Sequence, residues 1–291
     1  MDADRLATFE ANRQRLFSLA YRMLGEAAAA EDIVQDAYLR WAASTGVDVP
    51  EAWLTTVVTN LSLNRLTSAR AKRETYIGPW LPEPIVTDGG ALGPLETVEQ
   101  RESVSFGMLV LLERLTPPER AVFILREAFG HTHREIAEVL SIDEAHSRQL
   151  HRRARERVGE RRKRFDPSVE QRDRIVARLQ AAVEQGDVAA LERLLARDVE
   201  AWTDGGGAGA ARRPIYGRNK VARYLVGLSK RPEVAATVPT VVEINGDIGI
   251  VSGNGGTPLG VTVLELDADQ VQTIRLVVNP AKLGVVARQL A

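Results

Sequence analysis

The chain has 291 residues, a formal net charge of −1 and a hydrophobic content of 44%, enough to bury cores in two or three domains. It contains no cysteine, which excludes disulfides, thiolate catalysis and zinc–thiolate sites. No apolar run approaches the roughly 18 residues of a membrane-spanning helix, and MDADRLATFE at the start lacks a basic-then-apolar signal, so we expect a cytoplasmic protein without a membrane partner.

Residues 1–75 are expected to be helical throughout. Apolar residues recur at helical spacing over 9–24 and over 31–41. A third helix starts at Pro50, because proline suits the first turn of a helix. Three polar residues of the second helix lie outside its apolar stripe, and by themselves they are typical of a solvated face: Asp32, Gln35 and Asp36.

The third helix combines an apolar stripe with polar and basic side chains: Asn60, Asn64, Arg65, Arg70, Lys72 and Arg73. Trp53 lies near its start. One interpretation is that Trp53 stacks on unpaired bases while the arginines hold a separated strand. The other is that Trp53 is an ordinary core residue, since an amphipathic helix of this kind needs a bulky inner side chain. The residues alone leave both open.

Residues 76–105 are rich in proline and glycine and carry a net charge of −4, which is typical of a linker. This segment nevertheless contains the apolar sequence Trp80-Leu81-Pro82-Glu83-Pro84. A free tether rarely places a tryptophan between prolines. We therefore expect the segment to dock on another part of the protein.

Residues 106–165 carry a net charge of +4 and read as a helix-turn-helix. Thr116 and two prolines begin one helix, Thr132 and Glu135 match a capping box for the next, and Asp143 can cap a third. That third helix, from about Glu144 to Val158, has small, amide and basic residues on one face. Such a face suits the major groove of DNA, through Arg148, Gln149, Arg152 and Arg153.

Two alternatives apply to this segment. Its run of positive charge could be an ordinary solvated face, but the capped helix, short turn and basic helix occur in the order that DNA binding needs. All four histidines of the chain also fall here, which raises the question of zinc. Without cysteine partners we expect no metal and no other cofactor.

Residues 166–291 are expected to differ in fold class from the helical segments that precede them. Two helices are expected over 170–195, broken at Gly186, and a further helix near 219–228. Runs of alternating hydrophobicity then predict strands: VPTVVEI, DIGIVSG, GVTVLEL and VQTIRLVVN. The expected fold is an α+β domain with a curved antiparallel sheet. The turn Asp204-Gly205-Gly206-Gly207 could cradle a phosphate, but a tight turn with positive φ explains it more simply.

The order of modules over residues 1–162 resembles the extracytoplasmic-function sigma factors of bacterial RNA polymerase. LFSLAYRMLGEAAAAEDIVQDAYLRW resembles the part of region 2 that engages the polymerase clamp helices, which implies that interface for Asp32, Gln35 and Asp36. PEAWLTTVVTNLSLNRLTSARAKR resembles the part that melts and reads the minus-10 element, with Trp53, Asn60, Asn64 and Arg65 at matching positions. The family usually has aspartate where Asn64 stands. LTPPERAVFILRE onward resembles region 4, which reads the minus-35 element.

The rest is similar to one subgroup of that family, which carries a fused SnoaL-like domain. That subgroup has WLPEP in its linker, a DGGGK motif and an NPDKL motif. Here the second motif lacks its lysine, with alanine at 208, and the third lacks its aspartate and reads Asn279-Pro280-Ala281-Lys282-Leu283. We expect these three motifs to serve regulation, because the linker is apolar and stiffened by prolines and the C-terminal domain is neutral and has no histidine or cysteine for catalysis.

The sequence therefore predicts an alternative sigma factor with sigma region 2 at 1–75, a linker at 76–105, region 4 at 106–165 and a SnoaL-like regulatory domain at 166–291. Its expected partners are core RNA polymerase and promoter DNA, and no catalytic residue is expected. Two other classes remain open. One is a helix-turn-helix regulator with a ligand-binding domain, which would not need residues 1–75. The other is an enzyme of the SnoaL-like class, which would need ionisable groups converging in a cavity.

Overall fold

The computed structural model describes residues 3–88, 90, 92, 103–159, 168–207 and 210–291, and only the backbone at residues 3, 69–72, 74 and 169. The chain forms two compact units. One comprises residues 1–75 and 87–160, and the other comprises residues 76–86 and 161–291. Within the described residues, no helix combines the length and the apolarity that crossing a membrane requires.

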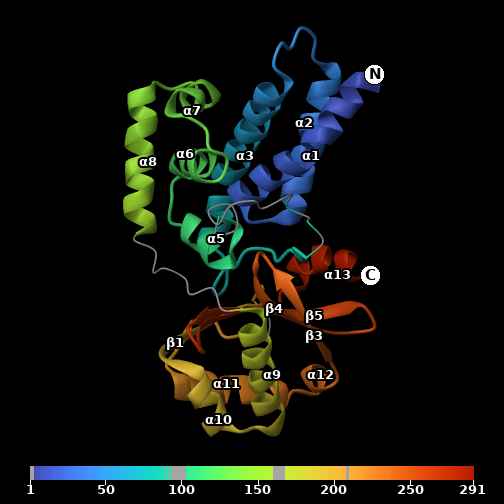
Figure 1. Ribbon diagram of the computed structural model, residues 1–291, viewed down its shortest axis with the longest axis vertical. Coiled ribbons are helices and arrows are strands. Elements are labelled where there is room, and N and C mark those ends of the chain that lie inside the picture. The colour runs from blue at the N-terminus through green and yellow to red at the C-terminus, as the bar shows by residue number, and fades with distance from the viewer. Residues whose placement is uncertain (1–2, 89, 91, 93–102, 160–167, 208–209) are drawn as a thin grey trace. The chain divides into compact units, whose positions relative to one another are not determined.

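The first unit begins with α1 (Ala3–Leu24), α2 (Ala27–Ala43) and α3 (Pro50–Glu74), which pack on one another (Figure 1). Their shared core buries the apolar stripes seen in the sequence, including Leu16, Met23, Ile33, Leu54 and Val58. Gly25, with a φ of 69°, makes the turn from α1 into α2. Pro50 opens α3 as expected.

The helix-turn-helix of the same unit follows α5 (Phe106–Leu112). It consists of α6 (Pro117–Glu127), α7 (His133–Leu140) and α8 (Glu144–Val158), whose expected start signals are confirmed. Thr132 and Glu135 form a capping box at α7, and the Asp143 side chain accepts a hydrogen bond from the His146 N–H at 2.7 Å. Each cap satisfies N–H groups that the first turn leaves unpaired, so local sequence places these three helix starts.

The second unit has a sheet of six strands within the described residues, in the order β2-β1-β6-β5-β4-β3. These are β1 (Leu195–Asp204), β2 (Ile215–Tyr216), β3 (Val238–Ile244), β4 (Asp247–Asn254), β5 (Thr257–Asp267) and β6 (Gln270–Val277). The expected α+β class is confirmed. The pairing is mixed rather than wholly antiparallel, because β1 lies parallel to β6 in the centre of the sheet.

Helices of this unit cover one face of the sheet: α9 (Val169–Gln185), α10 (Val188–Leu194) and α11 (Arg218–Ser229) (Figure 1). Their buried leucines and valines meet β1, β4, β5 and β6 in one core. The expected break between the first two helices lies at Gly186, whose φ is 67°. Three short helices complete the unit, namely α12 (Pro232–Ala235), the 3₁₀ helix η1 (Pro280–Lys282) and α13 (Gly284–Leu290).

Residues 76–86, which we call the strap, belong to the second unit although they directly follow α3 of the first. Thr87, Asp88, Gly90 and Leu92 belong to the first unit again. The segment expected as one linker, 76–105, is thus divided between the units, and residues 89, 91 and 93–102 within it lie outside the described residues. The expected boundary between the helix-turn-helix module and the last domain, between residues 165 and 166, also lies outside the described residues, because residues 160–167 are not among them.

Candidate functional sites

Helix α8 presents a polar and basic face to solvent. Leu150, Ala154 and Val158 are buried on its other side. The four side chains expected to meet DNA are all exposed and share the solvent face: Arg148, Gln149, Arg152 and Arg153. The exposed pair between Arg148 and Glu144, at 2.6 Å, holds the arginine only weakly. This face is therefore free to exchange its water for base edges and phosphates.

Helix α2 presents an acidic face. Asp32, Gln35 and Asp36 are exposed, whereas Ile33, Val34 and Ala37 of the same helix are buried. Asp32 lies 3.9 Å from Arg65 of α3, a contact between two exposed side chains. The three expected polymerase-binding side chains are therefore presented together on one helix face.

Helix α3 carries the residues expected at the minus-10 element. Asn60, Asn64 and Arg65 are exposed, and Trp53 is half-buried with its ring 5.7 Å from the ring of Trp41. Trp53 therefore packs partly in the helical core. The side chains of Arg70 and Lys72 lie outside the described residues.

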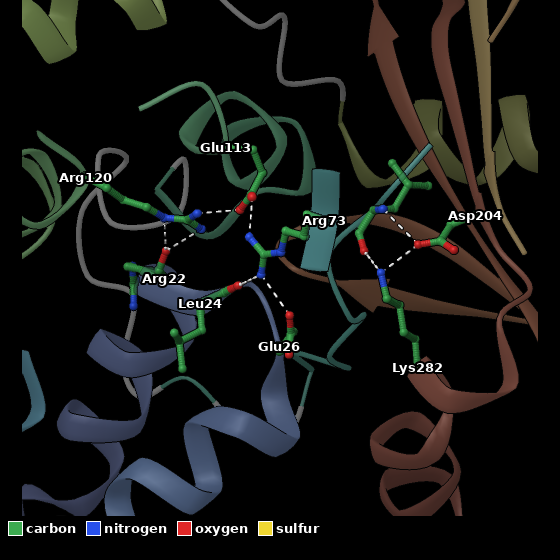
Figure 2. Close-up of polar contacts among 9 residues, drawn as sticks. Arg22, Leu24, Glu26, Arg73, Glu113, Arg120, Asp204 and Lys282 are labelled. Atoms are coloured by element: carbon green, nitrogen blue, oxygen red, sulfur yellow. Dashed lines mark hydrogen bonds and ion pairs between the residues drawn. The ribbon is translucent and has the colours of Figure 1, made fainter. Parts of the chain in front are cut away.

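Arg73, expected on the DNA face, is instead bonded inside the first unit (Figure 2). Its guanidinium donates to the Leu24 carbonyl at 2.7 Å and pairs with Glu26 at 2.8 Å and with Glu113. Glu113 pairs with Arg120 of α6 as well. These four residues, Glu26, Arg73, Glu113 and Arg120, form an ion cluster that joins the N-terminal helices to the helix-turn-helix.

Burial shapes the protonation of this region. Arg120 is 2% exposed and donates two hydrogen bonds to the Arg22 carbonyl. Burial lowers the pKa of Arg120, and the attraction of Glu113 partly opposes that. Burial would raise the pKa of Glu113, but Arg120 and Arg73 together outweigh it and hold that pKa below its ordinary value. Burial also lowers the pKa of Arg22 to about 9, so Arg22 is charged at neutral pH.

A second cluster lies in the C-terminal unit, where three sequence motifs meet (Figure 2). The fully buried Asp204 accepts a hydrogen bond from the Leu81 N–H at 2.9 Å and pairs with the Lys282 ammonium at 2.7 Å. The same ammonium donates to the Leu81 carbonyl and lies 4.2 Å from the centre of the Trp80 ring. We call Leu81, Asp204 and Lys282 the lock, because together they hold the strap.

Two further side chains complete this cluster. The Tyr76 hydroxyl bonds to Asp204 and accepts a hydrogen bond from Asn279 at 2.9 Å. Burial, together with the hydrogen bond and the charge of Asp204, raises the pKa of Tyr76 above its ordinary range. Gly206, with a φ of 61°, sits so close that an added Cβ would lie 2.8 Å from the Asn279 side chain. The glycine turn is thus a tight turn packed on Asn279.

The far end of the strap is held by hydrogen bonds to the backbone of Ile85 and Val86. Ile85 and Asn245 exchange two hydrogen bonds of 3.0 Å, and the Gln289 amide bonds both to the N–H and to the carbonyl of Val86. Pro82, Glu83 and Pro84 between these anchors are buried. The strap is therefore an integrated part of the C-terminal unit.

The remaining residues of the three motifs support this arrangement. Asn279 caps η1 by accepting from the Ala281 N–H at 3.1 Å, Pro280 opens that turn, and Leu283 is buried after it. Gly205 is buried and Gly207 has a φ of 95°, as the turn after β1 requires. Among the described residues, no group of three or more histidine, aspartate or glutamate side chains is arranged to hold a metal ion.

Comparison with known proteins decides the family. The model of Sigma-70 region 2 matches residues 8–72, and that of Sigma-70, region 4, matches residues 107–158. Over 230 residues the chain is 45% identical to the ECF RNA polymerase sigma factor SigJ of Mycobacterium tuberculosis, covering 78% of this chain and 73% of that protein. The chain belongs to the extracytoplasmic-function sigma factors of bacterial RNA polymerase.

Two further comparisons extend the match over nearly the whole chain. The probable ECF RNA polymerase sigma factor SigI of the same organism is 31% identical over 296 residues, covering 98% of this chain and 96% of that protein. The crystal structure of SigJ superposes with a TM-score of 0.76 at 37% identity, covering 96% of this chain and 98% of that one. The resemblance to extracytoplasmic-function sigma factors is thus confirmed over the C-terminal unit as well, and regions 2 and 4 bind core RNA polymerase and promoter DNA.

Sequence reasoning missed part of both clusters. Glu26, Glu113 and Arg120 carry no local pattern that distinguishes them from solvated charges, and their pairing spans up to 47 residues. Tyr76 stands next to the apolar linker sequence, so its packing could have been suspected. Asn245 and Gln289 gave no signal, because their roles arise only where the strap meets the sheet and α13.

Proposed function

We propose that this sigma factor reads the minus-35 element with the exposed face of α8 and the minus-10 element with the exposed residues of α3. The acidic face of α2 then engages the polymerase clamp helices. The observation that carries these assignments is the exposure of the expected residues on α2 and α8 and of Asn60, Asn64 and Arg65 on α3. In each helix the opposite side is buried, so the exposed faces are the ones free to bind.

We infer further that the C-terminal unit regulates initiation through the strap. The chain passes from α3 through the strap before it returns to the first unit, so regions 2 and 4 are connected through a segment that the lock holds. Releasing the lock together with the anchors at Asn245 and Gln289 frees eleven residues of linker, the length of the strap. A longer free linker changes the separation that the two regions can reach.

The ion cluster implies a closed resting form. Helix α3 contacts α6 and α7 within the first unit, so regions 2 and 4 touch. The two promoter elements are named for positions 25 base pairs apart, which is about 85 Å along the duplex. A unit in which the two regions touch cannot reach both elements. We therefore propose that the ion cluster separates when the sigma factor joins polymerase at a promoter.

The C-terminal unit acts as a regulatory domain rather than an enzyme in this proposal. Two of its motifs, those of Asp204 and of Lys282, bind the strap that carries the third, instead of forming a row of acid and base groups around a substrate. The sigma factor works with RNA polymerase, which assigns it to the cytoplasm.

Run-off transcription with core polymerase and a cognate promoter tests the regulatory proposal on the full chain. Lys282→Gln removes the charge that holds Asp204 and Leu81, so we expect a change in transcript yield of several-fold. Lys220→Gln removes an exposed lysine of the same unit and serves as the matched control. Equal yields from wild type and Lys282→Gln, at equal binding to core polymerase, would show that the lock has no regulatory role.

A further inference from the structure

The C-terminal unit contains a cavity of about 890 Å³, lined by α9, α11, α12 and the sheet and open to solvent at a mouth. That volume is in the range of pockets that hold drug-sized molecules. Its wall is made mostly of apolar side chains of the domain core, among them Leu179, Val183, Leu225, Ile250, Ile274 and Leu276. Filling the cavity with an apolar molecule would remove this wall from water.

The polar groups of the wall restrict the ligand. Thr203, which is 2% exposed, and Tyr224 line the cavity with hydroxyls 2.9 Å apart, so they form a hydrogen-bonded pair inside it. The charged residues of the described lining are exposed and lie at the mouth: Glu184, Lys230, Arg231 and Glu233. A charged ligand would find no buried counter-charge among the described lining, whereas a neutral one with a single oxygen would find two hydroxyls.

We propose that this cavity binds a neutral, mostly apolar small molecule with one hydrogen-bonding oxygen, and that its occupancy is transmitted to the strap. The transmission rests on the proposed function, in which the lock controls initiation. The molecule is bound at a regulatory site and is not transformed there.

The cavity and the lock share two short pieces of backbone. Thr203 lines the cavity and the next residue, Asp204, holds the strap, because successive side chains of a strand point to opposite faces. Val278 lines the cavity and the next residue, Asn279, bonds to Tyr76. The Val278 N–H donates to the Asp204 carbonyl at 2.8 Å, which ties the two pieces together. A ligand that fixes Thr203 therefore also fixes the residue that locks the strap.

This arrangement predicts positive coupling between ligand and lock. A molecule bonded to the Thr203–Tyr224 pair favours the strand end in its locked position. Coupling between two sites is reciprocal in binding free energy, so releasing the lock must weaken ligand binding by the same factor. The coupling can thus be measured with any ligand of the right chemistry.

Nile red, a neutral dye whose fluorescence rises in apolar surroundings, serves as the probe on the full-length protein. We expect saturable binding to the wild type. Leu228→Trp places an indole in the cavity from a half-buried position on α11 and should abolish that binding. Val241→Trp, at a site 43% exposed and away from the cavity, is the matched control and should bind as the wild type does. Equal binding by Leu228→Trp and wild type would overturn the site.

A second variant protects the test against misfolding of Leu228→Trp. Thr203→Val with Tyr224→Phe keeps the shape of the wall and removes both hydroxyls. We expect Nile red, which carries a carbonyl oxygen, to bind about fivefold more weakly, the effect of one neutral hydrogen bond. Unchanged affinity in this double variant would overturn the assigned role of the hydroxyl pair.

Lys282→Gln tests the transmission. We expect it to weaken Nile red binding by about fivefold, within the usual range of allosteric coupling, and unchanged affinity would overturn the transmission.

Run-off transcription separates this inference from the proposed function. If Lys282→Gln alters transcription while Leu228→Trp still binds dye, the cavity site fails and the proposed function stands. If dye binding behaves as expected while Lys282→Gln transcribes normally, the proposed function fails and the cavity site stands.

Discussion

Arg73, next to the last residue of α3, pairs with Glu113, the residue that follows α5. This contact joins the region that reads the minus-10 element to the region that reads the minus-35 element. Glu113 simultaneously pairs with the buried Arg120, so one carboxylate compensates two guanidinium groups. Its removal would leave two cations without their shared partner.

The first prediction therefore concerns Glu113→Gln. We expect a loss of about 3 kcal/mol of stabilisation between regions 2 and 4, because a buried pair loses one partner while the other stays charged. Because the chain has no cysteine, dyes can be placed at introduced Glu10→Cys and Glu138→Cys, both exposed positions. Energy transfer between them should fall in Glu113→Gln.

Glu127→Gln is a suitable comparison, because Glu127 pairs with His151 inside the helix-turn-helix rather than across the two regions. The dye-labelled protein with Glu127→Gln should show the same energy transfer as the dye-labelled protein without that substitution. If Glu113→Gln also leaves the transfer unchanged, the ion cluster does not hold the closed form.

The second prediction is a pH dependence. The pKa of Glu113 is lower in the folded protein than its ordinary value of 4.5. A depressed carboxyl pKa contributes stability that is fully present above the ordinary pKa and is lost as the pH falls through the folded value. We expect the closed form to open in acid as the pH falls below the ordinary value of 4.5, read by the same energy transfer. Glu113→Gln should show a smaller change over that window, and an equal change would assign the opening to other carboxylates.

The third prediction concerns the lock. Lys282→Gln leaves the fully buried Asp204 without its cation. We therefore expect the free energy of local opening of the strap to be about 3 kcal/mol lower than in the wild type. The Leu81 N–H, which donates to Asp204, should then exchange its hydrogen faster by roughly two orders of magnitude. Unchanged exchange at Leu81 would show that the strap is held by its other anchors at Asn245 and Gln289.

The fourth prediction tests the DNA face of α8. Arg152→Ala should weaken binding of the polymerase holoenzyme to a promoter by about 1–3 kcal/mol if the side chain reads a base, and should relax sequence preference in the minus-35 element alone. Arg197→Ala, an exposed arginine of β1, is the control. A loss that is equal for all minus-35 sequences would assign Arg152 to a phosphate instead.

The fifth prediction tests the acidic face of α2. Asp32→Lys with Asp36→Lys should abolish co-elution with core polymerase while changing the unfolding free energy by less than about 0.5 kcal/mol, because both side chains are exposed. Asp4→Lys with Glu10→Lys reverses two exposed acidic charges of α1, the same change in net charge, and should leave co-elution intact. Retained co-elution of the α2 variant would remove this face from the interface.

Local signals explain which features of the fold could be predicted. The capping boxes at Thr116 and Thr132 and the cap at Asp143 act within one helical turn, so the helix-turn-helix follows from short stretches of sequence. The strands of the C-terminal unit were visible as alternating runs. The parallel pairing of β1 with β6 could not be predicted from the sequence, because it joins strands about 70 residues apart and has no local signature.

The sequence by itself determined the helix-turn-helix, the exposed polar faces and the family, because each depends on periodicity, capping or motif order within a short window. Only the tertiary structure decided that Arg73 belongs to an ion cluster and that the strap belongs to the C-terminal unit. It also decided that Asp204, Lys282 and Leu81 meet. The reason is physical: a charge becomes a structural anchor only when folding buries it beside its partner, and those partners come from distant parts of the chain.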